Sequence, residues 1–254
     1  MSVVVLMYHG VERRPGPLFV EPSLFVEQLD AIVDAGVPAL TVSELAAGLD
    51  AGRLPAHGVA ITFDDGFASV VEHAGPALLD RGLRATVFCV AGRLGGSNAW
   101  PSARPGAVVV PLANGPDLTR LAALGFEIGG HGLEHAPLDT TDAVTIRREV
   151  AEGRRRLESA VGVAVRSFAY PYGARPSPAA AAAVAQAYRA ACTTRIGRVG
   201  PGSDLLALPR VDAHYLRSPE RLAAVLGGEA NAYLALRRAG ASARRRVVAD
   251  YRRG

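Results

Sequence analysis

The sequence predicts an α/β fold in which parallel strands, each followed by a helix, close into a (β/α) barrel. Short apolar runs alternate with segments of helical periodicity along the 254 residues, which is typical of a parallel sheet covered by helices. About seven or eight such units favour a barrel over an open sheet. The sequence carries neither a dinucleotide glycine fingerprint nor a phosphate-loop motif, which weighs against the open nucleotide-binding folds.

The expected strands are apolar runs that end in polar or turn-forming residues. They are residues 3–8, 39–41, 59–63, 85–90, 126–129, 167–170, 190–193 and 206–211. Helices are expected where apolar residues recur at helical spacing between capping and glycine signals. They are residues 23–35, a segment that starts at Ser43, and residues 69–81, 117–124, 141–160 and 178–188, with further helices to the C-terminus. Ser23 and Ser43 are the expected N-caps, and Gly36 and Gly82 are expected to end two of these helices.

Residues 91–116 predict a long loop, because Gly, Pro, Ser and Asn are concentrated there. A compact domain rarely carries so long a loop without a function, so we expect it on the substrate side of the barrel. The alternative is an exposed insertion without a role.

Positive charge is concentrated at the C-terminal end. The net charge is +4, and residues 237–254 hold seven Arg and one Asp, a balance of +6, so the rest of the chain carries −2. We therefore divide the chain into a barrel over residues 1–228 and an Arg-rich helical tail over residues 229–254. The tail is expected to be a solvated helix, with weak contact to an anionic membrane surface as the functional alternative. Nucleic-acid binding has no support beyond this tail and is not predicted.

Cysteine usage and the start of the chain bear on the compartment. Cys89 and Cys192 lie in apolar, strand-like stretches and are expected to be buried free thiols. The opening "MSVVVLMYHGV" has no basic region, and its apolar run is too short for a signal peptide or a membrane span, so the sequence predicts a cytoplasmic location. No feature of the sequence indicates an oligomeric state.

Polar and titratable residues follow several expected strands, at the edge of a barrel where functional groups gather. They are His9 after the first strand, Asp64 and Asp65 in "TFDDG", His131 and His135 in "HGLEH", Tyr172 in "FAYPYG", and Arg210 with Asp212 in "LPRVD". Two histidines four residues apart can bind one metal ion, and Asp64 and Asp65 are the natural source of a third ligand. Two histidines and one carboxylate leave an open coordination position, as a hydrolytic metal site requires.

The two neighbouring carboxylates can take different roles. Adjacent residues on a strand point to opposite sides, so one carboxylate can bind the cation while the other faces the water that the cation activates. The pair Asp64–Asp65 followed by Gly66 would by itself indicate only a turn. Together with "HGLEH" after another strand, it predicts a metal-dependent hydrolytic site.

Taken in order, "TFDDG", "HGLEH" and "FAYPYG" resemble the first three motifs of the polysaccharide deacetylases, the NodB-homology enzymes of carbohydrate esterase family 4. The resemblance spans residues 3–216 and implies a distorted, or incomplete, TIM-like barrel, a divalent metal ion, and removal of N-acetyl groups from sugars. By position, Asp64 resembles the catalytic base. Asp65, His131 and His135 resemble the metal ligands. Such a ligand set suits Zn²⁺ best, and Co²⁺ or Ni²⁺ also fit.

The third motif and the first strand supply the residues expected beside the substrate. The resemblance implies that the backbone N–H of Tyr172 helps to bind the oxyanion and that its ring lines the groove. Pro171 and Tyr8 are expected at the same place. The family's late Leu-x-His, which supplies the catalytic acid, is missing near the C-terminus. "LMYH" at residues 6–9 has that form, as in relatives that resemble a circularly permuted branch, so His9 is expected to protonate the leaving amine.

Two motif positions depart from the family pattern. The Arg that usually opens the third motif and orients the catalytic Asp is Ala169 here. Arg210 is the candidate replacement, with a structural Arg paired to a nearby carboxylate as an equal alternative. The Ser or Thr that usually follows the first histidine of the second motif is Gly132, which removes a hydroxyl that would stabilise the loop.

The sequence therefore predicts a metal-dependent hydrolase that deacetylates an N-acetylated amino sugar or glycan, releasing acetate and a free amine. The same site could instead serve a deformylase or a cyclic-imide or amide hydrolase. A different class of alternative is a catalytically weak glycan-binding protein, which the missing Arg at Ala169 motivates.

Overall fold

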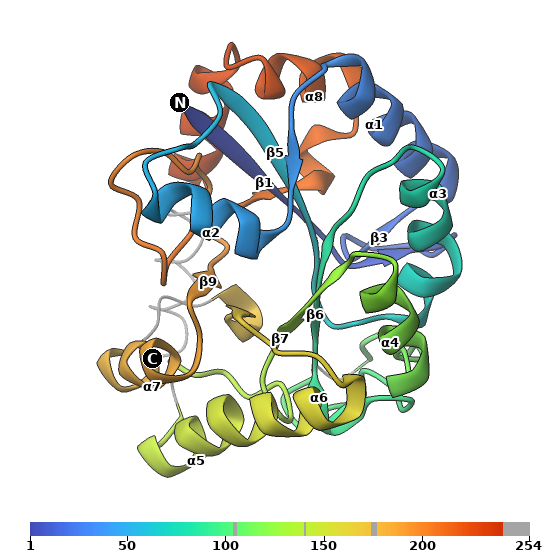
Figure 1. Ribbon diagram of the computed structural model, residues 1–254. Helices are drawn as coiled ribbons and strands as arrows, with labels where there is room; N and C mark the ends of the chain where they lie inside the picture. The colour runs from blue at the N-terminus through green and yellow to red at the C-terminus, as the bar shows by residue number, and fades with distance from the viewer. Residues whose placement is uncertain (104–105, 140, 174–176, 241–254) are drawn as a thin grey trace.

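A computed structural model describes residues 1–103, 106–139, 141–173 and 177–240. Eight parallel strands form one curled sheet in the order β10-β1-β5-β6-β7-β8-β9, with β4 beside β5 (Figure 1). The strands are β1 (Ser2–Tyr8), β4 (Ala39–Leu40), β5 (His57–Phe63), β6 (Thr86–Cys89), β7 (Glu127–Gly130), β8 (Ser167–Ala169), β9 (Ala190–Cys192) and β10 (Val211–Asp212). A second, small sheet pairs β2 (Gly10–Val11) with β3 (Phe19–Val20). This arrangement confirms the expected incomplete (β/α) barrel.

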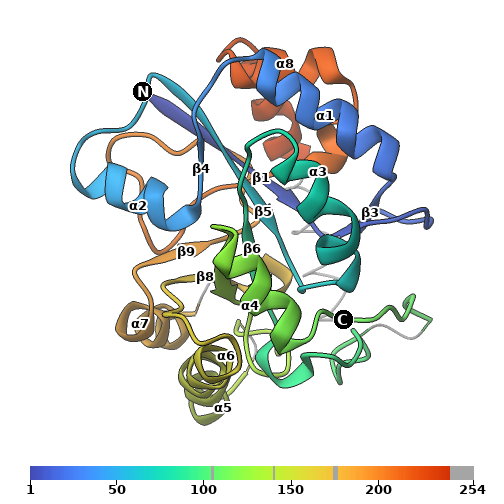
Figure 2. The same ribbon diagram turned by 45° about the vertical axis from the view of Figure 1, so that its right-hand side comes forward.

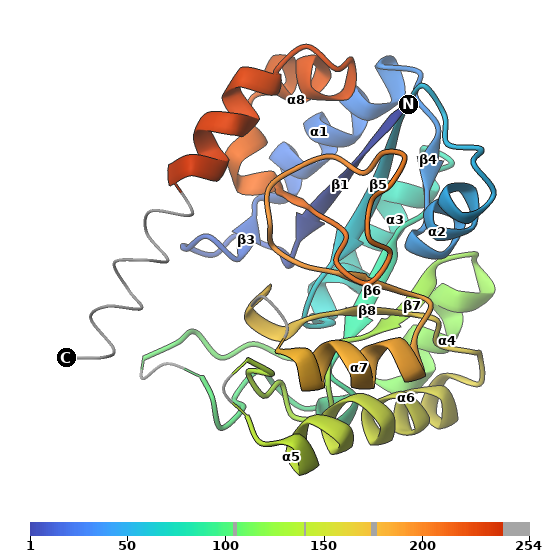
Figure 3. The same ribbon diagram turned by 90° about the vertical axis from the view of Figure 1, so that its left-hand side faces the viewer.

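The two ends of the sheet approach each other through one short segment. Leu208 forms a parallel bridge with Cys192 of β9, and Val211 of β10 pairs with Leu6 of β1. The expected strand over residues 206–211 is therefore shorter than predicted, because part of it pairs with β9 through a single bridge before β10 begins. In Figure 3, the connection from β9 to β10 crosses the side of β1 and β5 that lies opposite α1 and α3.

Helices cover the outer face of the curled sheet (Figures 1 and 2). They are α1 (Pro22–Asp34), α3 (Gly75–Leu79), α4 (Gly115–Ala123), α5 (Ala143–Arg147), α6 (Gly153–Val161), α7 (Pro178–Ala187) and α8 (Pro219–Leu226). Helix α2 (Val42–Asp50) instead packs against the opposite face of β1 and β5 through Val42, Leu45 and Ala46. A π-helical turn at Val70–Ala74 leads into α3, and another at Arg148–Glu152 joins α5 to α6. Single 3-10 turns lie at Ala91–Arg93, Pro171–Gly173 and Ala213–Leu216.

Both predicted N-caps, Ser23 and Ser43, are wrong by two residues. Thr41, and not Ser43, caps α2, because its side chain and that of Glu44 form a reciprocal capping box. Helix α1 begins at Pro22, whose fixed φ suits the first helical position, and its N-cap Glu21 makes no side-chain cap. The expected loop at 91–116 is interrupted by the 3-10 turn at Ala91–Arg93 and ends at α4.

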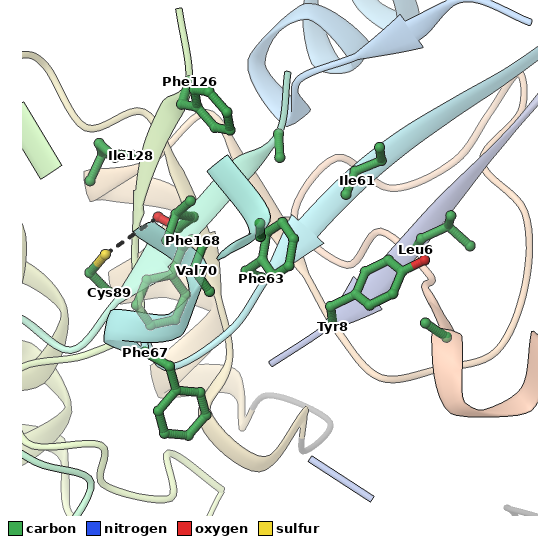
Figure 4. Close-up of a cluster of buried hydrophobic side chains, with 14 of the residues drawn as sticks. Leu6, Tyr8, Ile61, Phe63, Phe67, Val70, Cys89, Phe126, Ile128 and Phe168 are labelled. Atoms are coloured by element: carbon green, nitrogen blue, oxygen red, sulfur yellow. Dashed lines mark hydrogen bonds between the residues drawn. The ribbon is translucent and has the colours of Figure 1, made fainter. Parts of the chain in front are cut away.

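The strands of the barrel bury side chains on both faces. On β1, Val4, Leu6 and Tyr8 belong to the larger apolar cluster, which includes the buried side chains of α1. Val3 and Val5 belong to a second cluster inside the barrel. Figure 4 shows Tyr8 beside Leu6, Ile61 and Phe63 in the larger cluster. Because successive strand residues point to opposite faces, Tyr8 and His9 are directed to different sides of the sheet.

The first part of the expected tail packs against the barrel. Residues 231–240 are helical, and Leu234 is buried in the larger apolar cluster. The Tyr233 hydroxyl donates a hydrogen bond to the Tyr215 carbonyl over 2.7 Å. Residues 241–254, which carry five of the seven tail arginines, lie outside the described residues. Within the described residues, no helix is both long enough and apolar enough to cross a membrane.

Candidate active site

The two neighbouring aspartates lie where β5 ends and the chain turns. The strand continues to Phe63, and the Asp64 N–H still donates to the Tyr8 carbonyl at 2.9 Å. Asp65 then adopts φ 71° and Gly66 φ 73°, both in the left-handed region. The two carboxylates therefore diverge through a left-handed turn, and not through the strand alternation that the sequence suggested.

Asp65, His131 and His135 form a buried group that can bind a metal ion. Their candidate ligand atoms all lie within 4.8 Å of one another. The Asp65 Oδ1 atom is 3.4 Å from His131 Nε2 and 3.3 Å from His135 Nε2. Burial raises the pKa of the Asp65 carboxyl, but hydrogen bonds from His131 and then His135 outweigh burial, so the pKa lies well below its usual range. The carboxylate is therefore ionised, as a metal ligand must be.

The orientation of His131 fits this role. Its Nδ1 atom lies 2.8 Å from the Ala169 carbonyl oxygen, so Nδ1 carries the proton and donates to that oxygen. The Nε2 atom then faces the Asp65 carboxylate, so a divalent cation could take the place of the proton that Nε2 shares with Asp65. Metal-binding histidines usually donate their second ring N–H to a carbonyl or carboxylate in this way. The donor set of one carboxylate and two imidazoles thus fits a divalent ion such as Zn²⁺, Co²⁺ or Ni²⁺.

Arg210 binds the carboxylate of Asp64 in two places. Its Nη1 atom donates to Oδ1 at 2.6 Å and its Nη2 atom to Oδ2 at 2.7 Å, and the Arg210 residue is only 1% exposed. The Nε–H donates to the Thr193 carbonyl at 3.0 Å, which fixes the plane of the guanidinium. Ala169, where the motif suggested an Arg, is fully buried and contributes only its carbonyl to His131. Arg210 therefore reaches Asp64 from the segment between β9 and β10.

This pairing sets the charge of Asp64. Burial raises the pKa of the Asp64 carboxyl, but the charge of Arg210, together with His131 and the Arg210 hydrogen bonds, outweighs burial and brings the pKa below its usual value. Asp64 is consequently ionised at neutral pH and ready to accept a proton.

Tyr8 does not lie with the substrate-side residues, contrary to the sequence prediction. The side chain is 2% exposed and its ring packs edge-on against Phe25 with 5.3 Å between centroids. Its hydroxyl donates to Gln28 Oε1 at 3.1 Å. The strand alternation that buries Tyr8 with Leu6 on the outer face explains this position.

His9 follows Tyr8 and belongs to the opposite face of β1. The register of β1 on β5 pairs Tyr8 with Phe63, so the next residues along the two strands are His9 and Asp64. Burial raises the pKa of the Asp64 and Asp65 carboxyls, and the partly exposed His9 lies near enough to be one of the groups that lower it. The candidate acid and the candidate base are thus neighbours at one edge of the sheet.

The third motif contributes a wall to the site. Pro171 is buried, and Tyr172 is 50% exposed with φ 59°. The Tyr172 ring packs edge-on against His135 with 4.5 Å between centroids. Its hydroxyl donates to Ser102 Oγ at 2.8 Å, so the expected groove-side ring lies between a candidate metal ligand and the loop that follows β6.

The loop after β6 supplies two site residues that the motifs did not identify. Trp100 stacks on the His135 ring, with 4.2 Å between centroids and an interplanar angle of 29°. The Ser102 hydroxyl donates to the His135 carbonyl at 2.9 Å. The sequence indicated these two residues only indirectly. Residues 91–116 were expected on the substrate side of the barrel, and Trp100 is the single Trp of the chain.

Backbone strain is concentrated at this site. Among the described residues, three non-glycine residues have a positive φ, and they are Asp65, His135 and Tyr172. Such conformations cost on the order of 1–3 kcal/mol each and persist where surrounding contacts enforce them. Two candidate metal ligands and the candidate oxyanion residue therefore all occupy unfavourable backbone conformations.

A family model for the polysaccharide deacetylases matches residues 51–191. The chain belongs to the polysaccharide deacetylase family. A relative in Bacillus subtilis (strain 168) is YxkH, which is provisionally named a polysaccharide deacetylase. It is 24% identical over 208 residues, which cover 82% of this chain and 70% of YxkH. The chain is thus a hydrolase of this family.

Solved structures share the fold of this deacetylase. IcaB from Ammonifex degensii superposes with a TM-score of 0.75 at 27% identity, covering 89% of this chain and 96% of that one. The Streptococcus pyogenes deacetylase PplD, solved in complex with acetate, superposes with a TM-score of 0.76 at 24% identity, covering 89% and 98% of the two chains. Both comparisons agree with the incomplete (β/α) barrel described above.

Proposed function

We propose that this protein is a metal-dependent deacetylase that hydrolyses the N-acetyl group of an amino sugar or glycan to acetate and a free amine. The observation that carries the proposal is the convergence of Asp65, His131 and His135 beside an Asp64 that is ionised by Arg210. Family membership supports the deacetylase chemistry, and the donor set supports the dependence on a divalent cation, for which Zn²⁺ is the first candidate.

The residues of the site take separate roles in this reaction. A divalent cation held by Asp65, His131 and His135 would supply Lewis-acid polarisation of the carbonyl and a lower pKa for water. Asp64 accepts the proton that the attacking water loses as its oxygen bonds to the carbonyl carbon. The Tyr172 N–H donates to the developing oxyanion. His9 donates a proton to the nitrogen as the C–N bond breaks, so that acetate and the amine leave.

Arg210 has a positioning role in this scheme. It holds both oxygens of Asp64 in a fixed plane and keeps the carboxylate charged, so the base remains aligned and deprotonated before substrate binds. The glycan-binding alternative was motivated by Ala169, which stands where the motif usually has an Arg. Arg210 gives Asp64 a cationic partner from another segment, and this supports an enzyme over a glycan-binding protein.

The proposal is tested by acetate release from a panel of N-acetylated sugars and glycans, with the protein loaded with Zn²⁺ or Co²⁺ and then stripped by a chelator. Asp64→Asn should lower turnover by about 10²–10⁴-fold and leave metal content unchanged. Asp34→Asn, an equal charge change at an exposed site on α1, should behave as wild type. Release of formate or ring-opened imide in place of acetate would favour the deformylase or imide hydrolase. No release of acetate from any member of the panel would refute the proposal.

A further inference from the structure

A buried carboxylate outside the motifs contacts the loop that carries both candidate histidine ligands. Glu149 lies on the π-helical turn between α5 and α6 and is 3% exposed. Its Oε2 atom accepts the N–H of Leu133 at 2.9 Å, of Glu134 at 3.0 Å and of Ala136 at 3.3 Å, and its Oε1 accepts the Glu134 N–H at 3.1 Å. A buried carboxylate is costly unless such donors surround it.

Backbone hydrogen bonds from the start of the loop after β6 hold the carbonyl side of the same histidine loop. The carbonyls of Gly132 and Leu133 accept the N–H groups of Ala91 and Gly92 at 3.0 Å and 2.7 Å. The backbone between His131 and His135 is thus clamped between the start of the loop after β6 and the Glu149 carboxylate. Charge-assisted hydrogen bonds to three N–H groups make Glu149 the stronger side of this clamp.

Two glycines allow Glu149 to come this close. Gly132 adopts φ +86°, and a Cβ there would lie 2.7 Å from Glu149 Oε2. Gly153 lies one helical turn after Glu149 on the same face, and a Cβ there would lie 3.1 Å from the Gly132 carbonyl carbon and from the Leu133 nitrogen. The helix can therefore rest directly on the loop backbone.

We infer that Glu149 is a positioning residue that fixes the spacing and direction of His131 and His135 through the backbone of the loop between them. Removing its charge leaves three N–H donors facing a weaker acceptor and frees the loop, so the two imidazoles no longer converge as closely on Asp65. The inference rests on the metal site of the proposed function and adds a residue that no motif contains.

The test measures Zn²⁺ affinity by competition with a chromophoric chelator and the visible absorption spectrum of the Co²⁺-loaded protein. Glu149→Gln keeps the size of the side chain and should weaken Zn²⁺ binding by about 10–100-fold, as expected for outer residues that orient metal ligands. The Co²⁺ spectrum should change even at saturating metal. Glu152→Gln is the matched control, because Glu152 lies on the same π-helical turn, pairs with Arg148 and is half-exposed. The Zn²⁺ affinity of Glu152→Gln should stay within about twofold of that of the wild type.

Gly153→Ala provides an independent route if Glu149→Gln fails to fold. The added methyl improves helix propensity but displaces the helix from the loop, so Zn²⁺ affinity should fall and the Co²⁺ spectrum should change. Gly48→Ala on α2 is the matched control, because a Cβ there would meet Leu54 at an ordinary 3.5 Å. The Zn²⁺ affinity and the Co²⁺ spectrum of this variant should match those of the wild type.

The possible outcomes separate this inference from the proposed function. A wild-type protein that binds neither Zn²⁺ nor Co²⁺ overturns the proposed metal site itself. A wild type that binds the metal, together with Glu149→Gln or Gly153→Ala that bind it equally with an unchanged Co²⁺ spectrum, overturns the role of Glu149. A lower unfolding midpoint with an unchanged spectrum in the loaded protein assigns Glu149 to stability alone and also overturns the inference.

Discussion

A buried carboxylate near the starts of the strands and one near their carboxyl ends have different kinds of partner. At the start of β7, Glu127 accepts hydrogen bonds from the hydroxyls of Ser43 and Ser167, both at 2.6 Å, and from the Ser43 N–H and the Thr86 hydroxyl, both at 2.9 Å. At the end of β5, Asp65 instead faces the ring nitrogens of two histidines. The first carboxylate is saturated by fixed neutral donors, whereas the second is surrounded by groups that can share a cation.

The difference leads us to expect that one end of the barrel serves stability and the other serves chemistry. The hydroxyls around Glu127 come from α2, β6 and β8, so this carboxylate joins the helix that packs beneath the barrel interior to two strands. The opposite end gathers the strained residues Asp65, His135 and Tyr172. In parallel barrels the carboxyl ends of the strands carry function and the other end carries stability, and the candidate site of this chain lies at the carboxyl end.

Replacing Asp65 should have the largest effect and tests the assignment of function to one end. Asp65→Asn removes the negative ligand, so Zn²⁺ binding and acetate release should both fall to background while the fold remains. Metal content and circular dichroism are the measurements. Glu127→Gln, the matched change at the other end, should keep a full metal content. An Asp65→Asn protein with normal metal content would contradict the ligand assignment.

The second largest effect is expected on replacing Arg210, because the buried Asp64 carboxylate then loses its cationic partner. Arg210→Ala is expected to destabilise the protein by about 3–5 kcal/mol in urea unfolding and to lower turnover. Adding Asp64→Asn removes the stranded charge, so the double variant should lose less than the sum of the two single effects. Arg189→Ala, which breaks an exposed pair with Asp50, should cost no more than about 1 kcal/mol. Strict additivity of the double variant would show that Arg210 and Asp64 act independently.

A change at the stability end should affect unfolding without affecting catalysis. Glu127→Ala leaves the Ser43 N–H and three hydroxyls without their acceptor, so we expect a loss of about 1–3 kcal/mol in the free energy of unfolding. The value of kcat per bound metal should match wild type. A fall in kcat at full metal loading would mean that the two ends are coupled.

The smallest effect on stability is expected from a change at Tyr8, and this change tests whether Tyr8 belongs to the core or to the site. Tyr8→Phe removes one hydrogen bond to Gln28 and should cost about 0.5–1.5 kcal/mol of stability, with KM and kcat unchanged. A raised KM with unchanged stability would place Tyr8 with the substrate, as the sequence first suggested.

Local spacing made part of the site predictable. The run from His131 to His135 and the pair Asp64–Asp65 are short enough that their relative positions follow from the sequence. The predicted mechanism that separates the two aspartates was wrong, because β5 ends at Phe63 and both Asp65 and Gly66 have a left-handed φ, so strand alternation does not extend to Asp65. Ser43 was expected to cap α2, but its hydroxyl binds Glu127, a residue 84 positions away.

Contacts between distant segments were harder to predict. Arg210 was one of two equal interpretations, and its bond to Asp64 joins residues 146 positions apart. Glu149 gave no motif signal at all, because an acidic residue in a charged helix is ordinarily solvated. The burial of that helix face depends on Gly132 and Gly153 approaching each other across the fold.

The sequence by itself determined the alternation of strands and helices, a barrel, and a metal site made of His131, His135 and one of two neighbouring aspartates. These features follow from periodicity and from spacings of a few residues, where the chain geometry leaves little freedom. The incomplete form of the barrel and the choice of Asp65 as the ligand followed from the resemblance of the motifs to the polysaccharide deacetylases. The tertiary structure alone decided that Tyr8 faces the core, that Arg210 rather than a residue of the third motif pairs with Asp64, and that Glu149 contacts the histidine loop. Each of these depends on which faces and segments pack together, and that is set by the burial of the whole chain.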